Sequence, residues 1–381
     1  MRTVKSFKQT GSVIRSYSGD KGMKIIVDGM GGDNAPQEIV KGATMAAHEL
    51  AQLDPEIIVG IIGPQELMLN CLRKENWDCS SAEKISDDVF RYGNIDIINA
   101  TEVITNDEAP AMAVRKKKDS TIVKAMSLLK SGDADAFISA GSTGALLAGG
   151  LVTLGRIKGI RRPAIAAWFP KMHTGGTTLL LDCGANVEAK PEYIFQNGIM
   201  GAMYVEGVKG IERPEVRLLN IGAEDSKGDE LHKEAHRLLA GSNINFGGNI
   251  EGRDVATTDC EVVITDGFSG NIFLKGSEGV ALAIMKQFKK KLREGMLAKM
   301  GALMAYSKIS ELKEMFDYSD SGGAPILGLK GAVLKIHGNS KAVEVYYGVM
   351  KAIPYIRNNV TQMIADAVTQ NAELFKTGDE E

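Results

Sequence analysis

The chain has 381 residues, of which 44% are hydrophobic and 24% are charged, and its formal net charge is −3. This composition is typical of a soluble globular protein with a large core, and it excludes wholesale disorder and a global basic field for nucleic acid. The length is compatible with two lobes or with one large α/β domain.

The cysteines and the first residues give no sign of secretion. Cys71, Cys79, Cys183 and Cys260 are scattered without a C-x-x-C pair, which favours neither a zinc site nor a disulfide framework. Residues 1–22 are basic and polar and lack the apolar segment of a signal peptide. No apolar stretch approaches the roughly 20 residues that span a bilayer. We therefore expect a disordered tail over 1–22, native or added in cloning, and a cytoplasmic protein with reduced thiols.

From Met23 onward, short β-branched runs alternate with longer amphipathic segments. KIIVD at 24–28 is typical of a buried strand, and 37–53 carries apolar residues near the 3.6-residue period of a helix. In chain order, further strands are expected at 56–62, 95–99, 135–140, 164–169, 177–182, 216–221 and 261–266. Further helices are expected from about Pro64, at 119–131, 143–155, 191–206 and 226–240, and from about 270.

This alternation predicts an α/β fold with a doubly wound, mostly parallel sheet. We expect residues 23–381 to form a single large α/β domain with a helical protrusion near 286–320. In such a sheet, ligands bind beyond the carboxyl ends of the strands. The segments that follow strands are therefore the place to look for function.

Five of these strand ends are rich in glycine and small polar residues. Glycine lets backbone N–H groups approach an anion closely, and the helix that follows adds the positive end of its dipole. The sequence has no Walker A pattern and no full G-x-G-x-x-G after its first strand, which favours an anion smaller than a nucleotide. The five segments are DGMGGDNAP (28–36), SAGSTGAL (139–146), DCGANVEAKP (182–191), NIGAEDSKG (220–228) and TDGFSGN (265–271).

Eight motifs, which follow one another in a fixed order, resemble the acyl-ACP:phosphate acyltransferases of the PlsX type, where ACP is acyl carrier protein. The motifs are VDGMGGDNAP (27–36), AVRKKKDST (113–121), SAGSTGAL (139–146), LDCGANVEAKPEY (181–193), NIGAEDSKG (220–228), IEGRD (250–254), TDGFSGNIFLK (265–275) and GGAPILGLKG (322–331). The chain departs from the usual family residues at Gly29, Ser142, Ala223 and Ser269.

The resemblance implies an α/β/α fold related to phosphotransacetylases and isopropylmalate-type dehydrogenases, usually in a homodimer. It implies conversion of acyl-ACP and inorganic phosphate to acyl phosphate and free carrier protein, in bacterial phospholipid synthesis. It further implies a cytoplasmic protein that is peripherally associated with the membrane and hands its product to the next acyltransferase of glycerolipid synthesis.

This chemistry needs cations, N–H donors and small hydroxyls, and no covalent intermediate, because phosphate is itself the nucleophile. Orientation of two reactants supplies roughly 7–11 kcal/mol of barrier lowering, and an oxyanion donor roughly 3–4 kcal/mol. We expect Lys190, Asn186 and Asn271 to be catalytic, the two asparagines as oxyanion donors. The expected phosphate- and substrate-binding residues are Gly31, Gly32, Asp33, Asn34, Arg115, Lys116, Ser139, Ser142, Thr143, Asp182, Lys227, Arg253, Asp266 and Ser269. Lys275 is a further candidate cation.

Several of these candidates have a structural alternative. Asp28, Asp33, Asp182 and Asp266 would repel phosphate, so they are expected to bind the cations, cap helices, order loops or hold Mg²⁺. We predict no metal and no cofactor, because the reaction requires neither. Arg253 stands between two acids, and an ion pair that orders its loop is as good an interpretation as ligand contact.

Residues 286–316 combine a basic block with an apolar stripe of Met296, Met300, Leu303 and Met304. Such a stripe is more often core or a dimer seam than a lipid contact. Apolar residues beside Lys and Arg are also typical of adsorption to an anionic membrane. The block Lys286 to Arg293 equally suits the acidic ACP.

Three other functions remain as alternatives. A phosphotransacetylase would act on CoA esters, and a non-catalytic scaffold would bring enzymes together at the membrane. An NAD-dependent dehydrogenase ranks last, because no acid follows a strand in the context that a ribose requires.

Overall fold

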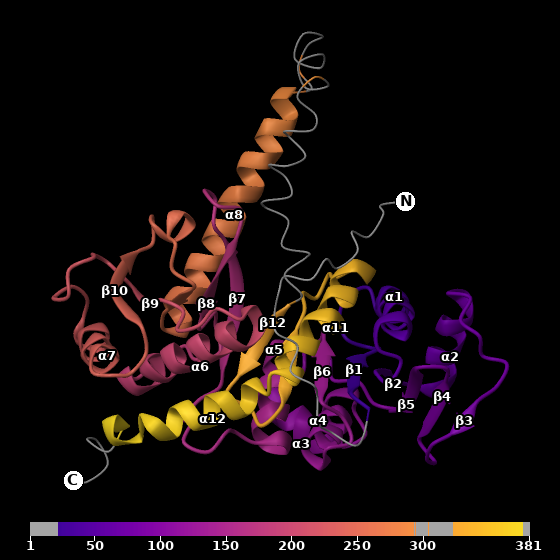
Figure 1. Ribbon diagram of the computed structural model, residues 1–381. Coiled ribbons are helices and arrows are strands. Elements are labelled where there is room, and N and C mark those ends of the chain that lie inside the picture. The colour runs from indigo at the N-terminus through magenta and orange to yellow at the C-terminus, as the bar shows by residue number, and fades with distance from the viewer. Residues whose placement is uncertain (1–21, 293, 295–303, 305–322, 376–381) are drawn as a thin grey trace.

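The computed structural model describes residues 22–292, 294, 304 and 323–375, and their strands form one large sheet with helices on both faces (Figure 1). The strands are β1 (Lys24–Asp28), β2 (Ile58–Gly63), β3 (Glu83–Lys84), β4 (Val89–Tyr92), β5 (Ile95–Asn99), β6 (Ala136–Ser139), β7 (Ala164–Pro170), β8 (Thr177–Leu181), β9 (Val216–Asn220), β10 (Phe246–Glu251), β11 (Val262–Ile264), β12 (Ala324–Leu327) and β13 (Ala332–Lys335).

Helices precede or follow most of these strands. They are α1 (Gln37–Leu53), α2 (Gln65–Lys74), α3 (Pro110–Lys116), α4 (Thr121–Ser131), α5 (Thr143–Gly149), the π-helix η1 (Gly150–Leu154), α6 (Pro191–Lys209), α7 (Glu230–Ala240), η2 (Val255–Thr257), α8 (Gly267–Leu292), α11 (Ala342–Arg357), α12 (Val360–Gln370) and η4 (Ala372–Phe375). None of the helices in this described part is both long and apolar enough to cross a membrane.

The sheet contains two parallel blocks, which we call the first block (β13, β6, β1, β2 and β5) and the second block (β10, β9, β11 and β8). Strands β7 and β12 join them with antiparallel pairings on both sides, and β4 and β3 add an antiparallel edge. The mostly parallel α/β sheet expected from the sequence is therefore confirmed.

The antiparallel joint makes the two blocks run in opposite directions. The first residue of β12 pairs with the last of β13 (Ala324 with Lys335), and its last residue pairs with the first of β7 (Leu327 with Ala164). The five glycine-rich strand ends therefore do not share one edge: β1 and β6 end at one edge, and β8, β9 and β11 at the other. Helix α8 follows β11 and runs back beside β7 and β8 before it protrudes from the body (Figure 1).

Apolar side chains cover both faces of the sheet, and each of the two buried clusters extends through both blocks. Ile25 of β1 and Leu181 of β8 belong to one buried cluster, and their neighbours Ile26 and Leu180 belong to the other. This alternation follows from the two-residue period of a strand. It supports the expectation of one domain, which stays a prediction.

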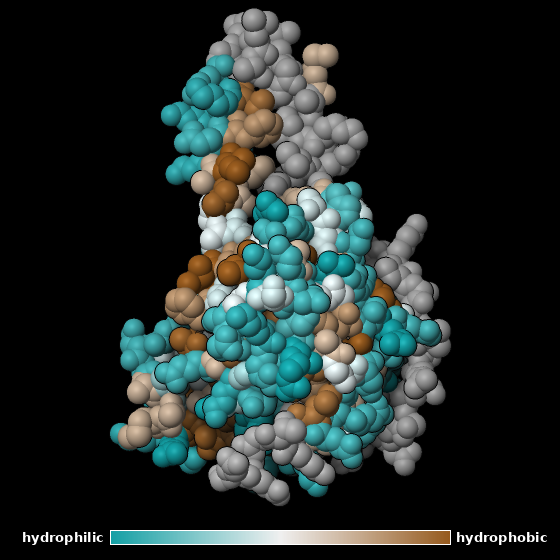
Figure 2. Space-filling model, turned by 90° about the vertical axis from the view of Figure 1, so that its left-hand side faces the viewer, coloured by the Kyte–Doolittle hydropathy of each residue, from teal (hydrophilic) through white to brown (hydrophobic). Residues whose placement is uncertain are grey.

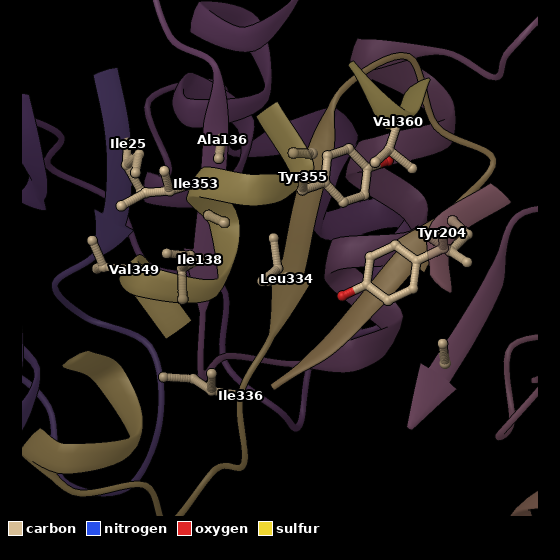
Figure 3. Packing of buried hydrophobic residues seen from close by; sticks show 14 of the residues in the cluster. Ile25, Ala136, Ile138, Tyr204, Leu334, Ile336, Val349, Ile353, Tyr355 and Val360 are labelled. Atoms are coloured by element: carbon tan, nitrogen blue, oxygen red, sulfur yellow. The ribbon is translucent and has the colours of Figure 1, made fainter. Parts of the chain in front are cut away.

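Helix α11 covers the first block. In Figure 3 its side chains Val349 and Ile353 lie against the side chains of β1, β6 and β13. Farther along, the ring of Tyr355 lies 5.7 Å from that of Tyr204 in α6. The last part of the chain thus completes the core around its first strand.

Local chemistry explains where several helices begin. The Ser120 hydroxyl accepts a hydrogen bond from the Val123 backbone N–H at the start of α4, and Asp229 accepts one from the His232 N–H at the start of α7. Because Asp229 caps α7, the helix expected at 226–240 begins at Glu230, and Lys227 lies in the loop before it instead of in the first turn. The helix expected at 143–155 continues from α5 as the π-helix η1.

Two expectations fall partly outside the described residues. Of the tail at 1–22, only Gly22 is described. The helical protrusion expected near 286–320 begins as the end of α8, which reaches Leu292, and beyond it only residues 294 and 304 are described.

The contact between α1 and α11 gives the first testable prediction. A Cβ on Gly42 would lie 2.4 Å from the Ala342 carbonyl oxygen and 2.5 Å from the Val345 Cβ. Gly42→Ala should therefore lower the free energy of unfolding by about 1–3 kcal/mol, seen as a lower urea midpoint. The control is Gly276→Ala in α8, where nothing lies within 4 Å, and there alanine should be neutral or stabilising. Equal midpoints for the two variants would contradict this packing.

Candidate active site

The ends of β1 and β6 are tied together by a buried acid. The Ser139 hydroxyl donates to Asp28 Oδ2 at 2.6 Å, the Met30 backbone N–H donates to Oδ1 at 3.2 Å, and the Gly141 N–H donates to the Ser139 oxygen at 3.0 Å. Burial raises the pKa of Asp28, and these hydrogen bonds partly offset that effect. Asp28 therefore orders the two loops.

The two adjacent glycines allow the loops to touch. A Cβ on Gly31 would lie 2.7 Å from Asp28 Oδ2 and 2.8 Å from the Gly141 nitrogen. Gly32 has φ +91°, a backbone conformation that residues other than glycine rarely adopt. The loop after β1 therefore has no room for side chains at Gly31 and Gly32, and backbone groups form its surface there.

The loop after β1 is also bound to the loop between β13 and α11. The Asp33 N–H donates to the Gly338 carbonyl oxygen at 2.7 Å, and the Asn34 amide donates to the carbonyls of Asn339 and Ser340. Helix α1 has no side-chain cap, so Asn34 orders this turn and does not cap the helix.

Lys335, at the end of β13, is a cation that the sequence analysis missed. Its ammonium donates to the carbonyl oxygens of Ala140 and Ile336. Burial lowers its pKa to about 8, while the carboxylates of Asp33 and Asp28 act in the opposite direction. The signal was present as a strand end followed by K-I-H-G at 335–338. His337 of the same segment also has a pKa lowered by burial.

Helix α8 brings a further cation, Lys275, toward Lys335 and His337. Lys275 contributes to lowering the pKa of both Lys335 and His337, as a nearby positive charge does. Asn271 lies one turn before Lys275 on α8 and is exposed, and a Cβ on Gly184 would lie 3.3 Å from its Cγ. Lys275 therefore lies near the carboxyl edge of the first block, whereas Asn271 lies against the loop after β8.

The loop after β8 is organised by Asp182, which is fully buried. Its Oδ1 accepts from the backbone N–H groups of Ile165, Gly184 and Ala185, and its Oδ2 accepts from the backbone and side-chain N–H groups of Asn186. Burial raises its pKa, and the hydrogen bonds oppose this. Of the four roles that the sequence left open for Asp182, the structure shows loop ordering. Its role in substrate binding stays a prediction.

The Asn186 amide is also engaged within the protein. Its Nδ2 donates to Asp182 Oδ2 and to the Pro163 carbonyl oxygen, each at 2.9 Å. Both of its N–H bonds are therefore used, and Asn271 is the better placed of the two expected oxyanion donors.

Asp266 performs a similar task at the start of α8. Its Oδ1 accepts from the backbone N–H groups of Phe268 and Ser269, at 3.0 and 2.9 Å. Burial by itself would raise its pKa, but the His232 ring that faces it at 3.5 Å and the hydrogen bonds from Ser269 outweigh it and lower the pKa to about 2. Asp266 is therefore a charged cap of the helix that carries Ser269 and Asn271.

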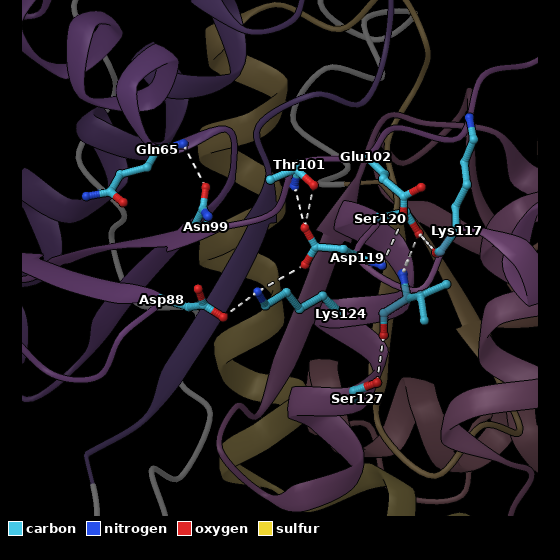
Figure 4. A network of polar contacts seen from close by, with 11 residues as sticks. Gln65, Asp88, Asn99, Thr101, Glu102, Lys117, Asp119, Ser120, Lys124 and Ser127 are labelled. Atoms are coloured by element: carbon cyan, nitrogen blue, oxygen red, sulfur yellow. Dashed lines mark hydrogen bonds and ion pairs between the residues drawn. The ribbon is translucent and has the colours of Figure 1, made fainter.

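A polar network holds the segment that carries Arg115 and Lys116 (Figure 4). Asp119 accepts from the backbone and hydroxyl of Thr101 at 2.8 and 2.7 Å, and Lys124 bridges Asp119 and Asp88 at 3.2 and 2.8 Å. These contacts fix the chain between β5 and α4 to the sheet edge. Arg115 and Lys116 are exposed in the last turn of α3.

The remaining expected residues vary in their relation to the site. Ser142 caps α5, accepting from the Ala145 N–H at 3.4 Å, and Thr143 is the first residue of that helix. Lys190 is exposed at the start of α6. Arg253 is exposed and paired with Glu251 at 3.1 Å and Asp254 at 3.7 Å, which is the ion pair that the sequence allowed.

The expected residues therefore fall into two groups and a remainder. One group is at the carboxyl edge of the first block: Gly31, Gly32, Asp33, Asn34, Ser139, Ser142 and Thr143. The other is around the start of α8: Asp182, Asn186, Asp266, Ser269 and Asn271. No hydrogen bond or ion pair in the described part of the chain joins either group to the side chains of Arg115, Lys116, Lys190, Lys227 and Arg253. Among the described residues, no three acidic, histidine or cysteine side chains come together as a metal site.

Comparison with known proteins identifies the family. A model described as "Fatty acid synthesis protein" matches residues 23–363. A phosphate acyltransferase of Thermoanaerobacter pseudethanolicus is 42% identical over 358 residues, covering 94% of this chain and 99% of the relative. The chain belongs to the phosphate acyltransferase family. A second member, from Clostridium acetobutylicum, is 42% identical over 343 residues, covering 90% of this chain and 98% of the relative.

Solved structures support the fold of this phosphate acyltransferase family member. A phosphotransacetylase from Streptococcus pyogenes matches with a TM-score of 0.56 at 18% identity, covering 90% of this chain and 94% of that one. A second, the EutD phosphotransacetylase from Staphylococcus aureus, matches with a TM-score of 0.54 at 15% identity, covering 89% and 95%. The family resemblance and the α/β fold class expected from the sequence are thus confirmed.

The buried acid of the β8 loop gives a prediction about stability. In Asp182→Asn, one carbonyl oxygen replaces two carboxylate oxygens that accept five hydrogen bonds, so several buried N–H groups lose their acceptor. The free energy of unfolding should fall by about 2–4 kcal/mol in urea titrations. Asp225→Asn, in which an exposed acid is changed, is the control and should have little effect. An unchanged midpoint for Asp182→Asn would refute the loop-ordering role.

Proposed function

We propose that this protein transfers the acyl group of acyl-ACP to inorganic phosphate, giving acyl phosphate and free carrier protein, in bacterial phospholipid synthesis. Membership of the phosphate acyltransferase family supports the phosphate and the acyl transfer. The acyl-ACP donor and the pathway are supported by the sequence motifs. The observation that carries the proposal is the partly buried ammonium of Lys335, which lies beside two glycine-rich loops and near Lys275 of α8.

Phosphate binds at the carboxyl edge of the first block in this proposal. The backbone N–H of Gly32 and the first turn of α5 supply N–H donors, and Lys335 and Lys275 supply charge. The carboxylate of Asp28 is compatible with an anion because Ser139 and backbone groups already hydrogen-bond it.

The reaction is one displacement at the thioester carbonyl. A phosphate oxygen attacks the carbonyl carbon, the C–O bond forms, and the C–S bond breaks as the electron pair leaves with the carrier-protein sulfur. The thiolate is a good leaving group, with a thiol pKa of roughly 8.5. Asn271 and Lys190 are proposed to stabilise the carbonyl oxygen, a contribution of roughly 3–4 kcal/mol for one donor.

Lys335 gives a test of the phosphate site. Lys335→Met removes the partly buried charge while keeping an unbranched side chain, and it should raise the KM for phosphate about 10- to 100-fold, as expected for a charged hydrogen bond. In the wild type, the same KM should rise as pH increases through about 8, because the ammonium then loses its proton. The measurement is the phosphate-dependent release of carrier-protein thiol.

Lys330→Met is the matched control, because Lys330 is exposed in the turn between β12 and β13. It should leave the KM for phosphate unchanged. If wild-type protein forms no acyl phosphate from acyl-ACP, the proposed function is wrong. Activity on acyl-CoA and none on acyl-ACP would favour a phosphotransacetylase instead, the alternative that agrees with the structural neighbours.

The protruding part of α8 is proposed to carry the homodimer contact and the contact with anionic membrane. Figure 2 shows brown, apolar side chains along this protrusion beside teal, hydrophilic ones. Val280, Ile284 and Phe288 recur every four residues and are all exposed. The basic residues Lys286 and Lys289 to Lys291 follow on the same helix and suit anionic lipid or the acidic ACP. Of the apolar stripe expected further on, Met296, Met300 and Leu303 lie outside the described residues, and Met304 is 87% exposed.

A pair of aspartate substitutions tests the dimer. Ile284→Asp places a charge among the apolar side chains of α8 and should yield monomers in sedimentation equilibrium. Lys286→Asp introduces the same residue about half a turn around the helix and should remain dimeric. Dimers in both variants would contradict a seam on α8.

Co-sedimentation with anionic and neutral vesicles tests the membrane contact, which should weaken in Lys286→Asp. The next acyltransferase of glycerolipid synthesis, which would consume acyl phosphate at that surface, stays a proposed partner.

A further inference from the structure

His337 lies where three loops meet at the carboxyl edge of the first block, and none of the roles described so far uses it. Immediately before it, the Ile336 backbone N–H donates to the Ser139 carbonyl oxygen at 3.0 Å. Immediately after it, the Gly338 carbonyl oxygen accepts from the Asp33 N–H at 2.7 Å. His337 is therefore fixed between the loops after β6 and β1, the two loops at which phosphate is proposed to bind.

The protein holds this residue by its backbone and leaves its ring available. The His337 carbonyl oxygen accepts from the Ser340 N–H at 3.1 Å, which closes the turn after β13. The residue is exposed, and within the described part of the chain its ring takes part in no hydrogen bond or ion pair. A change of the side chain therefore removes none of the contacts that hold the loop.

Two cations and two acids from three elements surround the ring. Crowding by protein atoms has the largest effect on the pKa of His337 and lowers it, and the positive charges of Lys275 on α8 and Lys335 on β13 lower it further. Glu278 on α8 and Glu344 on α11 act in the opposite direction. Because the pKa stays below the ordinary 6.5, the ring is neutral at neutral pH and has one nitrogen that can accept a proton.

The proposed reaction has a proton to move between its two substrates. Hydrogen phosphate carries a proton that acyl phosphate does not keep, and the departing sulfur needs one. As the C–O bond forms, phosphate becomes ester-like, and the proton left on it then has a pKa of roughly 6. The thiol that is released has a pKa of roughly 8.5. An imidazole with a pKa below 6.5 is matched to the first transfer, and as imidazolium it is acidic enough for the second.

We propose that His337 carries this proton: its neutral ring takes the proton of hydrogen phosphate as a phosphate oxygen attacks the thioester carbonyl, and the imidazolium gives it to the sulfur. The electron pair of the C–S bond leaves with the sulfur and forms the new S–H bond. The ring ends neutral, so no other reactant is consumed. Lys275 and Lys335 hold phosphate beside the ring and disfavour its protonation by solvent. This inference rests on the proposed function.

The first experiment measures kcat and the KM for phosphate in His337→Gln, by the release of carrier-protein thiol. Glutamine keeps a polar side chain that cannot carry a proton. The kcat should fall about 100-fold, at the lower end for general acid–base catalysis, while the KM for phosphate stays close to the wild-type value. Lys335→Met should show the reverse division between kcat and KM. In His337→Ala, added imidazole should restore part of the lost kcat.

His48→Gln is the matched control, because His48 is an exposed residue of α1 whose ring lies 4.5 Å from that of Trp77. It should keep the wild-type kcat. The urea midpoint of His337→Gln should equal that of the wild type, since backbone groups hold the loop.

The pH dependence tests which group carries the proton. The wild-type kcat at saturating phosphate should fall as the pH drops through the pKa of His337, below 6.5, because the protonated ring can no longer accept. Phosphate also changes charge near neutral pH, so the ratio of wild-type to His337→Gln kcat is the informative quantity, and it should shrink as the pH falls. Lys275→Met should raise the pKa at which the His337 ring proton resonances titrate by about 0.3–1 pH unit, and Glu278→Gln should lower it.

Three outcomes would overturn the inference: an unchanged kcat in His337→Gln, a loss of kcat that is the same at every pH, or no rescue of His337→Ala by imidazole. A rise in the KM for phosphate with kcat unchanged would make His337 a phosphate ligand and contradict the proton transfer. Failure of the proposed function has a different signature, because wild-type protein would then form no acyl phosphate from acyl-ACP, while the His337 ring would still titrate below 6.5.

Discussion

The site depends on the antiparallel joint made by β7 and β12. In an all-parallel sheet, the loops after β1, β6, β8 and β11 would lie along one edge. Here β12 pairs with the end of β13 and with the start of β7, so the second block is turned over and shifted relative to the first. Helix α8 starts at the carboxyl edge of the second block and runs back beside that block. It therefore reaches the carboxyl edge of the first block. Lys275 on α8 and Lys335 on β13 are near each other for this reason.

Electrostatics around the site show how an anion-binding surface tolerates several buried acids. Asp28, Asp182 and Asp266 each use their oxygens within the protein, as acceptors for loops or as a helix cap. Each acid thereby orders a loop within the protein and leaves neighbouring cations such as Lys335 available to an anion. The exception is Asp266 Oδ2, which has a histidine opposite it in place of a hydrogen bond.

The sequence was informative where local chemistry decides the structure. Glycines such as Gly31 and Gly32 indicated loops with close backbone approach, and strand ends such as Asp28 and Asp182 were recognised as polar centres. The relative direction of the blocks was not predictable, because it depends on pairings between β12 and strands far away in the chain. Lys335 was missed because a lysine after an apolar run is usually exposed, and only the covering of β13 makes it partly buried. The Asn186 amide was overestimated as a free donor, since its two acceptors become visible only when the loop closes on Asp182 and Pro163.

The closure of the first block by the end of the chain has a consequence for synthesis on the ribosome. Strand β6 pairs with β1 early, but its other neighbour, β13, and the covering helix α11 emerge only after more than half of the chain has followed. Until then, the apolar face around Ile138 lacks the cover of α11, and β6 has an open edge. Such a nascent chain exposes aggregation-prone surface for a long time. We therefore expect its folding yield to depend on chaperones that hold the first half until α11 arrives.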